Sequence, residues 1–166
     1  YCAGVRHFDF SQCAAKTGFV LDLAGPIGTA AVAAPTILSF TVEVTGRAAH
    51  AGFAPEAGVH AIDAAARGLV RLRQGRLEGG TTLNVGLISG GAAANIVPER
   101  CVLSGEIRSM RHDRALAFYD ALCTVFREEA QAVGACARVD CDVPLRAYRA
   151  AENGDCLLYT SDAADE

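Results

Sequence analysis

His50 is the residue of this sequence with the clearest capacity for chemistry. It lies in the stretch GRAAHAGFAPEAGVHAIDAA (46–65), between small residues and two positions before Gly52. Imidazole is the usual side chain for proton transfer and hydrogen bonding near neutral pH, and small neighbours leave a substrate room to approach it. A loop histidine with no task fits the same residues equally well, so the stretch by itself leaves both interpretations open.

Asn95 and Arg108 are two polar side chains that could bind a substrate. Asn95 follows the pair Gly90-Gly91, which would let the backbone approach a ligand closely, and Arg108 lies in the stretch GEIRS. An asparagine amide both donates and accepts hydrogen bonds, and a planar guanidinium can hold a carboxylate through two parallel bonds. Residue type alone favours a plainer interpretation, a turn asparagine and a solvated strand arginine.

Asp22 is the candidate metal ligand of the sequence. The stretch GFVLD (18–22) is typical of a short buried strand, and a Gly-Pro turn follows its terminal carboxylate at positions 25–26. Oxygen ligation from the end of a strand suits a metal site, although an aspartate before a turn is often only a turn or cap residue.

Alternating and helical patterns predict the elements that would position these residues. Four strands are expected where apolar and polar residues alternate, at 36–44, 81–91, 100–109 and 137–143. One helix is expected from Pro55, and another from Asp113 to Gly134. The apolar stripe of the first helix is expected at Val59, Ile62, Ala66 and Leu69.

The order strand, helix, strand, strand, helix, strand predicts an α+β fold of the ferredoxin-like, split β-α-β type. In this fold a four-stranded antiparallel sheet carries both helices on one face. The spatial order of its strands is fourth, first, third, second, so the strand at 81–89 is expected at an edge.

Composition excludes several classes of function. The chain has 166 residues and a formal net charge of −4, so no basic surface is expected to bind nucleic acid. No stretch has the length and apolar character of a membrane span, and no membrane partner is expected. The seven cysteines are scattered, odd in number and without a CxxC pair, which indicates reduced thiols and a cytoplasmic location.

Four stretches together resemble one enzyme family. They are GFVLDLAGPIG, GRAAHAGFAPEAGVHAI, GRLEGGTTLNVGLISGGAAANIVPE and GEIRS. The set resembles the peptidase T-like enzymes, which belong to the dinuclear zinc peptidases together with carboxypeptidase G, aminoacylase and succinyl-diaminopimelate desuccinylase. Each stretch alone is weak, but the resemblance runs from Tyr1 to Asp142 with the spacing intact. It implies a zinc-binding catalytic domain that is interrupted by a ferredoxin-like lid, which is also the dimerisation domain.

The resemblance divides the chain into four parts. Residues 1–33 correspond to the C-terminal edge of the first catalytic segment, 34–143 to the lid, and 144–153 to the return toward the catalytic domain. Residues 154–166 include LLYTSDAADE, which resembles a translated sequencing adapter and is expected to be a non-native tail. An ordinary disordered acidic tail is the alternative.

The resemblance also implies roles for individual residues. His50 would reach the active site of the opposite subunit and hydrogen-bond the oxygen of the scissile amide, which makes it the catalytic residue of this part. Asn95 and Arg108, with Gly91 beside them, would bind the polar backbone or carboxylate of the substrate. Asp22 would be a terminal ligand of one of two Zn²⁺ ions. The remaining ligands and the catalytic glutamate have no match here, so the chain alone is expected neither to hold zinc tightly nor to hydrolyse peptides.

Two functions therefore remain in view. The preferred one is a fragment of a cytoplasmic, homodimeric zinc peptidase or amidohydrolase that acts on a peptide or an acylated amino acid. The alternative is a stand-alone ferredoxin-like module that binds a small molecule or dimerises without catalysis. The opening stretch distinguishes them, since a free module has no need of GFVLDLAGPIG.

Overall fold

The structure is a computed structural model that describes residues 7–15, 24–29 and 31–149. The chain divides into two compact units, one of which is Pro35–Ala147. The other unit takes residues from both ends of the chain. Its described elements are the 3-10 turn η2 (Phe10–Gln12) and the antiparallel pair β1 (Ala33–Ala34) and β9 (Tyr148–Arg149). Asp22, the predicted metal ligand, lies outside the described residues, as do residues 154–166.

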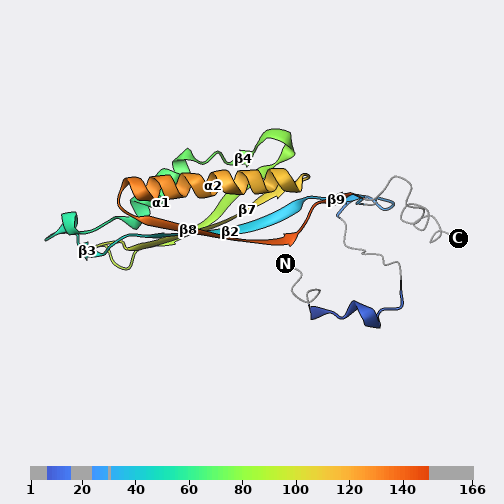
Figure 1. Cartoon of the computed structure of the whole chain (residues 1–166), viewed down its shortest axis with the longest axis horizontal. Coiled ribbons are helices and arrows are strands. Elements are labelled where there is room, and N and C mark those ends of the chain that lie inside the picture. Colours follow the sequence, from blue (N-terminus) through green and yellow to red (C-terminus); the bar gives the residue numbers. More distant parts are fainter. Residues whose placement is uncertain (1–6, 16–23, 30, 150–166) are drawn as a thin grey trace. The chain divides into compact units, whose positions relative to one another are not determined.

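The unit Pro35–Ala147 is an antiparallel sheet with two helices on one face (Figure 1). Its long strands are β2 (Thr36–Thr45), β5 (Thr82–Gly90), β7 (Arg100–Ser109) and β8 (Cys136–Leu145). Its helices are α1 (Ala61–Arg71) and α2 (His112–Ala132). The strand order is β4-β5-β7-β2-β8, in which β4 (Gly75–Arg76) has two residues. The predicted ferredoxin-like fold is confirmed, and β4 is an addition too short to show any alternation.

Four short elements complete this unit. The two-residue strands β3 (Ala49–His50) and β6 (Ile96–Val97) pair with each other in an antiparallel ladder of their own. The 3-10 turns η3 (Pro55–Ala57) and η4 (Glu78–Gly80) lie in the connections before α1 and before β5.

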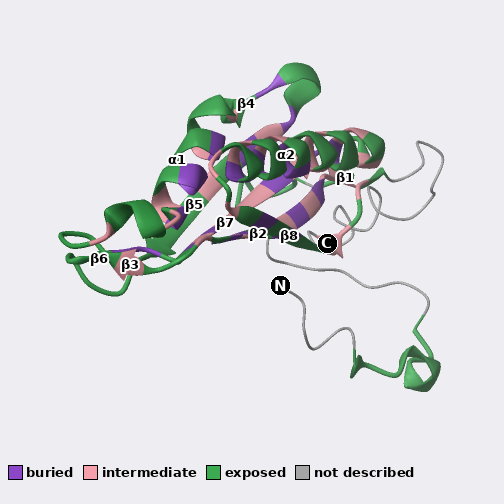
Figure 2. Ribbon diagram, turned by 60° about the vertical axis from the view of Figure 1, so that its left-hand side comes forward, coloured by how far each residue is buried: buried purple, intermediate pink, exposed green. Residues whose placement is uncertain are grey.

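The core fills the space between the sheet and the helices, as the purple segments of Figure 2 show. Strand alternation directs Leu38, Phe40, Val42 and Val44 of β2 toward it, and all four are buried. In α1 the buried positions are Ala61, Ala64, Ala65 and Gly68. The predicted apolar stripe is therefore wrong at Ala66, which is exposed. The face of α1 toward the core is made of the smallest residues, which lets the helix lie close to its neighbours.

The helix predicted from Pro55 begins later, at Ala61. Pro55 opens only the turn η3, and Val59 is then held in extended backbone by a bridge to Arg47, with N–O distances of 3.0 and 2.9 Å. His60 ends this extended segment and caps α1, because its Nδ1 accepts the backbone N–H of Asp63 at 3.1 Å. Pairing with residues far from the helix overrides the local helical pattern here.

The two ends of the unit meet at Thr36. Its Oγ1 accepts the backbone N–H of Ala147 at 2.8 Å and lies 3.1 Å from Nδ1 of His112. The boundary predicted after residue 143 falls inside β8, which continues to Leu145 because Leu145 still pairs with Ile37.

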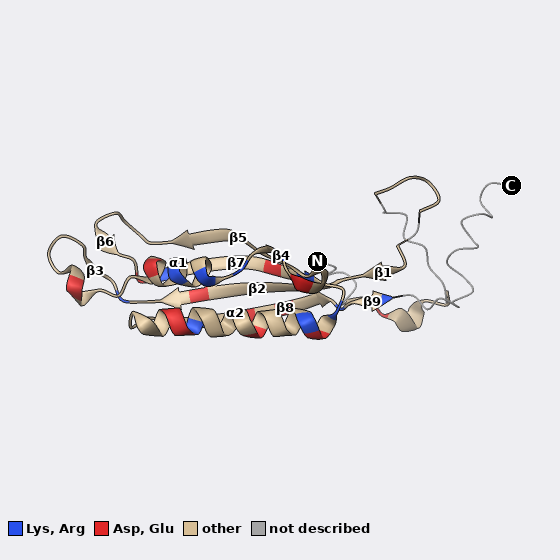
Figure 3. Cartoon of the chain, turned by 90° about the horizontal axis from the view of Figure 1, so that it is seen from above, with Lys and Arg blue, Asp and Glu red and all other residues tan. Residues whose placement is uncertain are grey.

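No helix of the described residues has the length and apolar character needed to cross a membrane. The long helix α2 carries charged residues along its length, as Figure 3 shows.

Candidate functional site

His50 lies in β3, at the end of the unit Pro35–Ala147 where β3 pairs with β6. Its side chain is exposed, and its Nδ1 accepts two backbone N–H groups, from Gly52 at 3.1 Å and from Phe53 at 3.2 Å. A ring nitrogen that accepts hydrogen bonds carries no proton, so in the neutral imidazole the proton is assigned to Nε2. The chain therefore presents an N–H donor outward at this tip.

The ring of His50 is fixed to its own loop. Besides the two hydrogen bonds to Nδ1, the ring of Phe53 lies against it, with 4.3 Å between the ring centroids and 33° between the planes. The small neighbours of His50 suggest a ring free to move on the loop. The structure instead shows the imidazole held against the loop by two hydrogen bonds and by the ring of Phe53.

Asn95 and Gly91 lie beside the His50 loop. The carbonyl of Asn95 accepts the backbone N–H of Ala51 at 2.9 Å, and Ile96 pairs directly with His50. Gly91 has a φ of +79°, in the left-handed region that favours glycine. Two open hollows of about 270 and 430 Å³ lie at this end of the sheet, and both are lined by Gly91 and Ile96. Glu99 and Arg100 also line the first hollow, and His60 lines the second. The structure therefore brings three of the predicted site residues to one end of the sheet, with room for a ligand.

Arg108 lies at the opposite end of the sheet. It pairs with Ile37 of β2 and with Thr82 of β5. The strand β7 has 10 residues, and at about 3.4 Å per residue its ends are about 30 Å apart. The guanidinium of Arg108 binds the carboxylate of Glu106 through Nε at 2.7 Å and Nη2 at 3.2 Å. Within one chain, Arg108 and His50 cannot touch the same small substrate.

The described residues do not fit a metal site of their own. Among them, no three His, Cys, Asp or Glu side chains lie together as a zinc ion would require. Two other histidines have structural partners, since His60 caps α1 and His112 lies beside Thr36. We therefore derive no catalytic step through a metal.

An exposed ion pair stands near the His50 end of the sheet. Arg100 binds Glu43 through Nε at 2.8 Å and Nη2 at 3.2 Å, and this hydrogen bonding lowers the pKa of Glu43. Burial has the opposite effect on a thiol of the core, raising the pKa of Cys101. All five cysteines within the described part of the chain are free.

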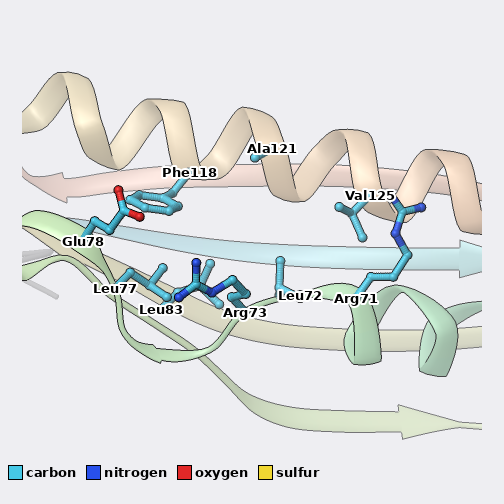
Figure 4. A pocket seen from close by; sticks show the side chains of 9 residues that line it. All are labelled: Arg71, Leu72, Arg73, Leu77, Glu78, Leu83, Phe118, Ala121 and Val125. Carbon is cyan, nitrogen blue, oxygen red and sulfur yellow. The ribbon is translucent and has the colours of Figure 1, made fainter.

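A further hollow, of about 250 Å³, lies on the helix side of the sheet between the end of α1, the segment 72–83 and α2 (Figure 4). Its inner surface is apolar, with Phe118 of α2 facing Leu77 and Leu83. At its rim the guanidinium of Arg71 is held by two glutamates of α2, at 2.6 and 3.0 Å. Arg73 and Glu78 also line it, but no Ser, Thr, Cys or His side chain does, so we give it no chemical role.

Comparison with known families decides what kind of domain this is. Residues 32–133, more than half of the chain, match the family described as "Peptidase dimerisation domain". The chain belongs to this family. The matched range covers most of the sheet, both helices and the His50 loop.

Solved structures resemble this dimerisation domain closely. The aminopeptidase PepT of Bacillus cereus ATCC 10987 is 33% identical, with a TM-score of 0.80 over 92% of this chain and 41% of that chain. A tripeptidase of Staphylococcus aureus Mu50 is 30% identical, with a TM-score of 0.83 over 92% of this chain and 40% of that chain. A relative in sequence, the uncharacterised protein YqjE of Bacillus subtilis 168, is 34% identical over 84% of this chain and 38% of its own length. The chain thus spans about two fifths of the length of these proteins.

Phe53 is the residue of the dimerisation domain that sequence reasoning missed. Its side chain is 86% exposed although it contacts His50. The available signal was an aromatic residue three positions after the histidine, in a stretch otherwise made of alanine, glycine and proline.

Proposed function

We propose that this chain is the lid of a peptidase or related amide hydrolase, in which His50 contacts the substrate held by the partner subunit of a homodimer. The observation that carries the proposal is the donor that His50 presents at an exposed tip, with its Nδ1 occupied by two backbone N–H groups. The similarity to an aminopeptidase and a tripeptidase supports peptides as substrates. Acylated amino acids, which contain the same amide, are the related class.

The chemistry of amide hydrolysis gives this donor its use. When a nucleophile adds to the amide carbon, the carbonyl oxygen gains negative charge, and a fixed N–H stabilises that charge in the transition state. Nε2 of His50 would supply such a donor. Removing one donor of this kind typically lowers kcat by roughly 10²–10³-fold.

The free edge of β5 supports dimer formation. The short strand β4 pairs only with Thr82 and Leu83, and the rest of β5 has no neighbouring strand on that side among the described residues. Figure 3 shows β5 without a charged residue, so no charge protects the edge from pairing. A two-fold partner can pair the same strand antiparallel to itself and continue the sheet across the dimer.

Antiparallel pairing of β5 would also reunite the separated site residues. Thr82, at one end of β5, is the neighbour of Arg108. Gly90, at the other end, adjoins Gly91 and the loop that holds Asn95. A two-fold axis through β5 places the Thr82 end of one copy beside the Gly90 end of the other. Arg108 of one subunit would then face His50 and Asn95 of the other, and the three could bind one substrate.

The finer features follow the resemblance to the peptidase T-like enzymes. We infer that the full-length protein is a cytoplasmic aminopeptidase-type enzyme with two zinc ions, one of them bound by Asp22. No group of candidate ligands lies among the described residues, so the other ligands would come from other segments of the full-length protein. Substrate binding, donor placement and dimerisation are the parts that this chain would supply.

Mixing two defective subunits tests the proposal. In the full-length enzyme, His50→Ala should lower activity by roughly 10²–10³-fold with bound zinc unchanged, and Asp22→Ala should lose metal and activity. In a mixed dimer, the subunit with intact metal ligands receives an intact His50 from its partner. Half of randomly mixed dimers are of this kind and one of their two sites is complete, so activity should recover to roughly a quarter of wild type.

Three outcomes would contradict the proposal. Absence of recovery in the mixture would place His50 in the site of its own subunit. Loss of zinc from His50→Ala would make this residue a ligand instead of a donor. A full-length protein without amide hydrolase activity would favour the stand-alone binding module.

A further inference from the structure

The geometry points to Phe53 as a specificity-determining residue: we propose that its ring forms an apolar wall for the substrate side chain next to the carbonyl that His50 contacts. The enzyme would therefore prefer amides with a large apolar side chain on the acyl side of the scissile bond. This inference rests on the proposed function and adds the substrate class that the lid selects.

The first argument is distance. The ring centroids of Phe53 and His50 are 4.3 Å apart, and the backbone N–H of Phe53 donates to Nδ1 of the same imidazole at 3.2 Å. A carbonyl oxygen bound to Nε2 lies about 3 Å from that atom. The side chain beside such a carbonyl then falls within van der Waals reach of the phenyl ring.

The second argument is exposure. The Phe53 side chain is 86% exposed, whereas Leu38, Phe40, Val42 and Val44 of β2 in the same unit are buried. Its ring lies against one imidazole face, which leaves the other side of the phenyl ring uncovered among the described residues. A phenyl group stacked beside a catalytic donor provides a rigid apolar surface with little side-chain entropy to lose on binding.

The third argument is the character of the loop. Between Arg47 and Glu56 the residues are AAHAGFAP, with no charged or hydroxyl side chain. His50 is the single polar side chain of these eight residues, so this segment offers one side-chain hydrogen-bond donor among apolar neighbours. A charged substrate side chain would lose hydration here without gaining a partner, whereas an apolar one would bury area on both sides.

The test compares two substrates in the full-length enzyme. Phe53→Ala should lower kcat/KM for a tripeptide with leucine at the acyl side of the cleaved bond by roughly 10-fold or more, because a pocket contact of this size is worth that factor. For the matching alanine tripeptide, kcat/KM should change by less than about 3-fold. Phe53→Leu should keep most of the leucine preference. Val70→Ala is the matched control, since Val70 is also 86% exposed and lies on α1.

A second measurement uses the present chain and needs no activity. The ring of Phe53 should shift the carbon-bound proton resonances of the His50 imidazole, and Phe53→Ala should abolish this ring-current shift while Val70→Ala leaves it unchanged. Equal losses for the two tripeptides, or no loss for either, would overturn the proposal. An unaffected His50→Ala enzyme would instead refute the proposed function, and the specificity assignment would fall with it.

Discussion

Replacing Val85 by proline tests whether the free edge of β5 makes the dimer. The backbone N–H of Val85 points away from β7, because it donates to Oε1 of Gln74 at 2.9 Å. Proline at this position removes that outward donor and leaves the hydrogen bonds between β5 and β7 in place. The residue before proline must be extended, which Asn84 already is within β5.

The proline is expected to cost the dimer much more free energy than it costs the folded monomer. The folded monomer loses one hydrogen bond, worth about 0.5–1.5 kcal/mol. The dimer loses a donor on both copies of the strand, and the proline ring prevents close approach of the two edges. A loss of at least about 3 kcal/mol weakens the Kd of the dimer at least about 100-fold.

Gln74→Ala is the matched control for Val85→Pro. It removes the acceptor, so the monomer loses the same hydrogen bond, yet it leaves the N–H of Val85 available to a partner strand. Sedimentation of both variants over a range of concentrations gives the Kd of the dimer. Urea unfolding gives the free energy of unfolding of the monomer. A Val85→Pro chain that dimerises as tightly as wild type would refute the β5 interface, as would Gln74→Ala weakening the dimer equally.

Two further predictions concern the core. A methyl group at Gly68 would lie 2.5 Å from Cδ1 of Phe126, so the overpacking cost of about 1–3 kcal/mol should exceed the gain of about 1 kcal/mol in helix propensity. Urea unfolding should find Gly68→Ala less stable than wild type, with partial recovery when Phe126→Leu is added; a more stable single variant would contradict this packing. Burial raises the pKa of Cys101 above its ordinary value of 9.0, so its contribution to stability is complete below about pH 9 and is lost as the pH rises through the folded-state pKa. Wild type should therefore lose more free energy of unfolding than Cys101→Ala between about pH 8 and about pH 10.5, and equal losses would exclude Cys101 as the cause.

Strand alternation carried most of the prediction of the fold. Ile107, for example, lies between Glu106 and Arg108 and is buried, as the alternating pattern of 100–109 predicts. Gly134 ends α2 with a φ of +76°, the conformation that a helix-terminating glycine supplies. These signals are local, which is why a single sequence reveals them.

The parts of the fold that sequence reasoning missed depend on contacts between distant residues. The start of α1 at Ala61 follows from the bridge between Arg47 and Val59, which no local sequence pattern predicts. The strand β4 consists of Gly75 and Arg76 and exists through its pairing with β5. Tertiary pairing overrides propensity in both cases.

The candidate site also has features that local sequence predicts and features that depend on contacts between distant residues. The types of His50 and Asn95 suggested chemistry, but their adjacency comes from the two-residue strands β3 and β6, which are too short to show a pattern. The distance of Arg108 from both follows from strand direction, so it emerges only once the sheet is assembled. Sequence reasoning did not single out Phe53, because an exposed aromatic residue indicates a role only once its contact with His50 is known.

Because the two ends of the unit Pro35–Ala147 meet at Thr36, this unit can be inserted into another protein as one piece. The chain enters at β2 and leaves after β8, and the bond from the N–H of Ala147 to Oγ1 of Thr36 spans 2.8 Å. A segment with its ends so close can be spliced into a surface loop of a host protein without forcing that loop apart. In one such step a host acquires an open sheet edge along β5 and, near the Gly90 end of that edge, a tip that carries an imidazole beside an aromatic ring.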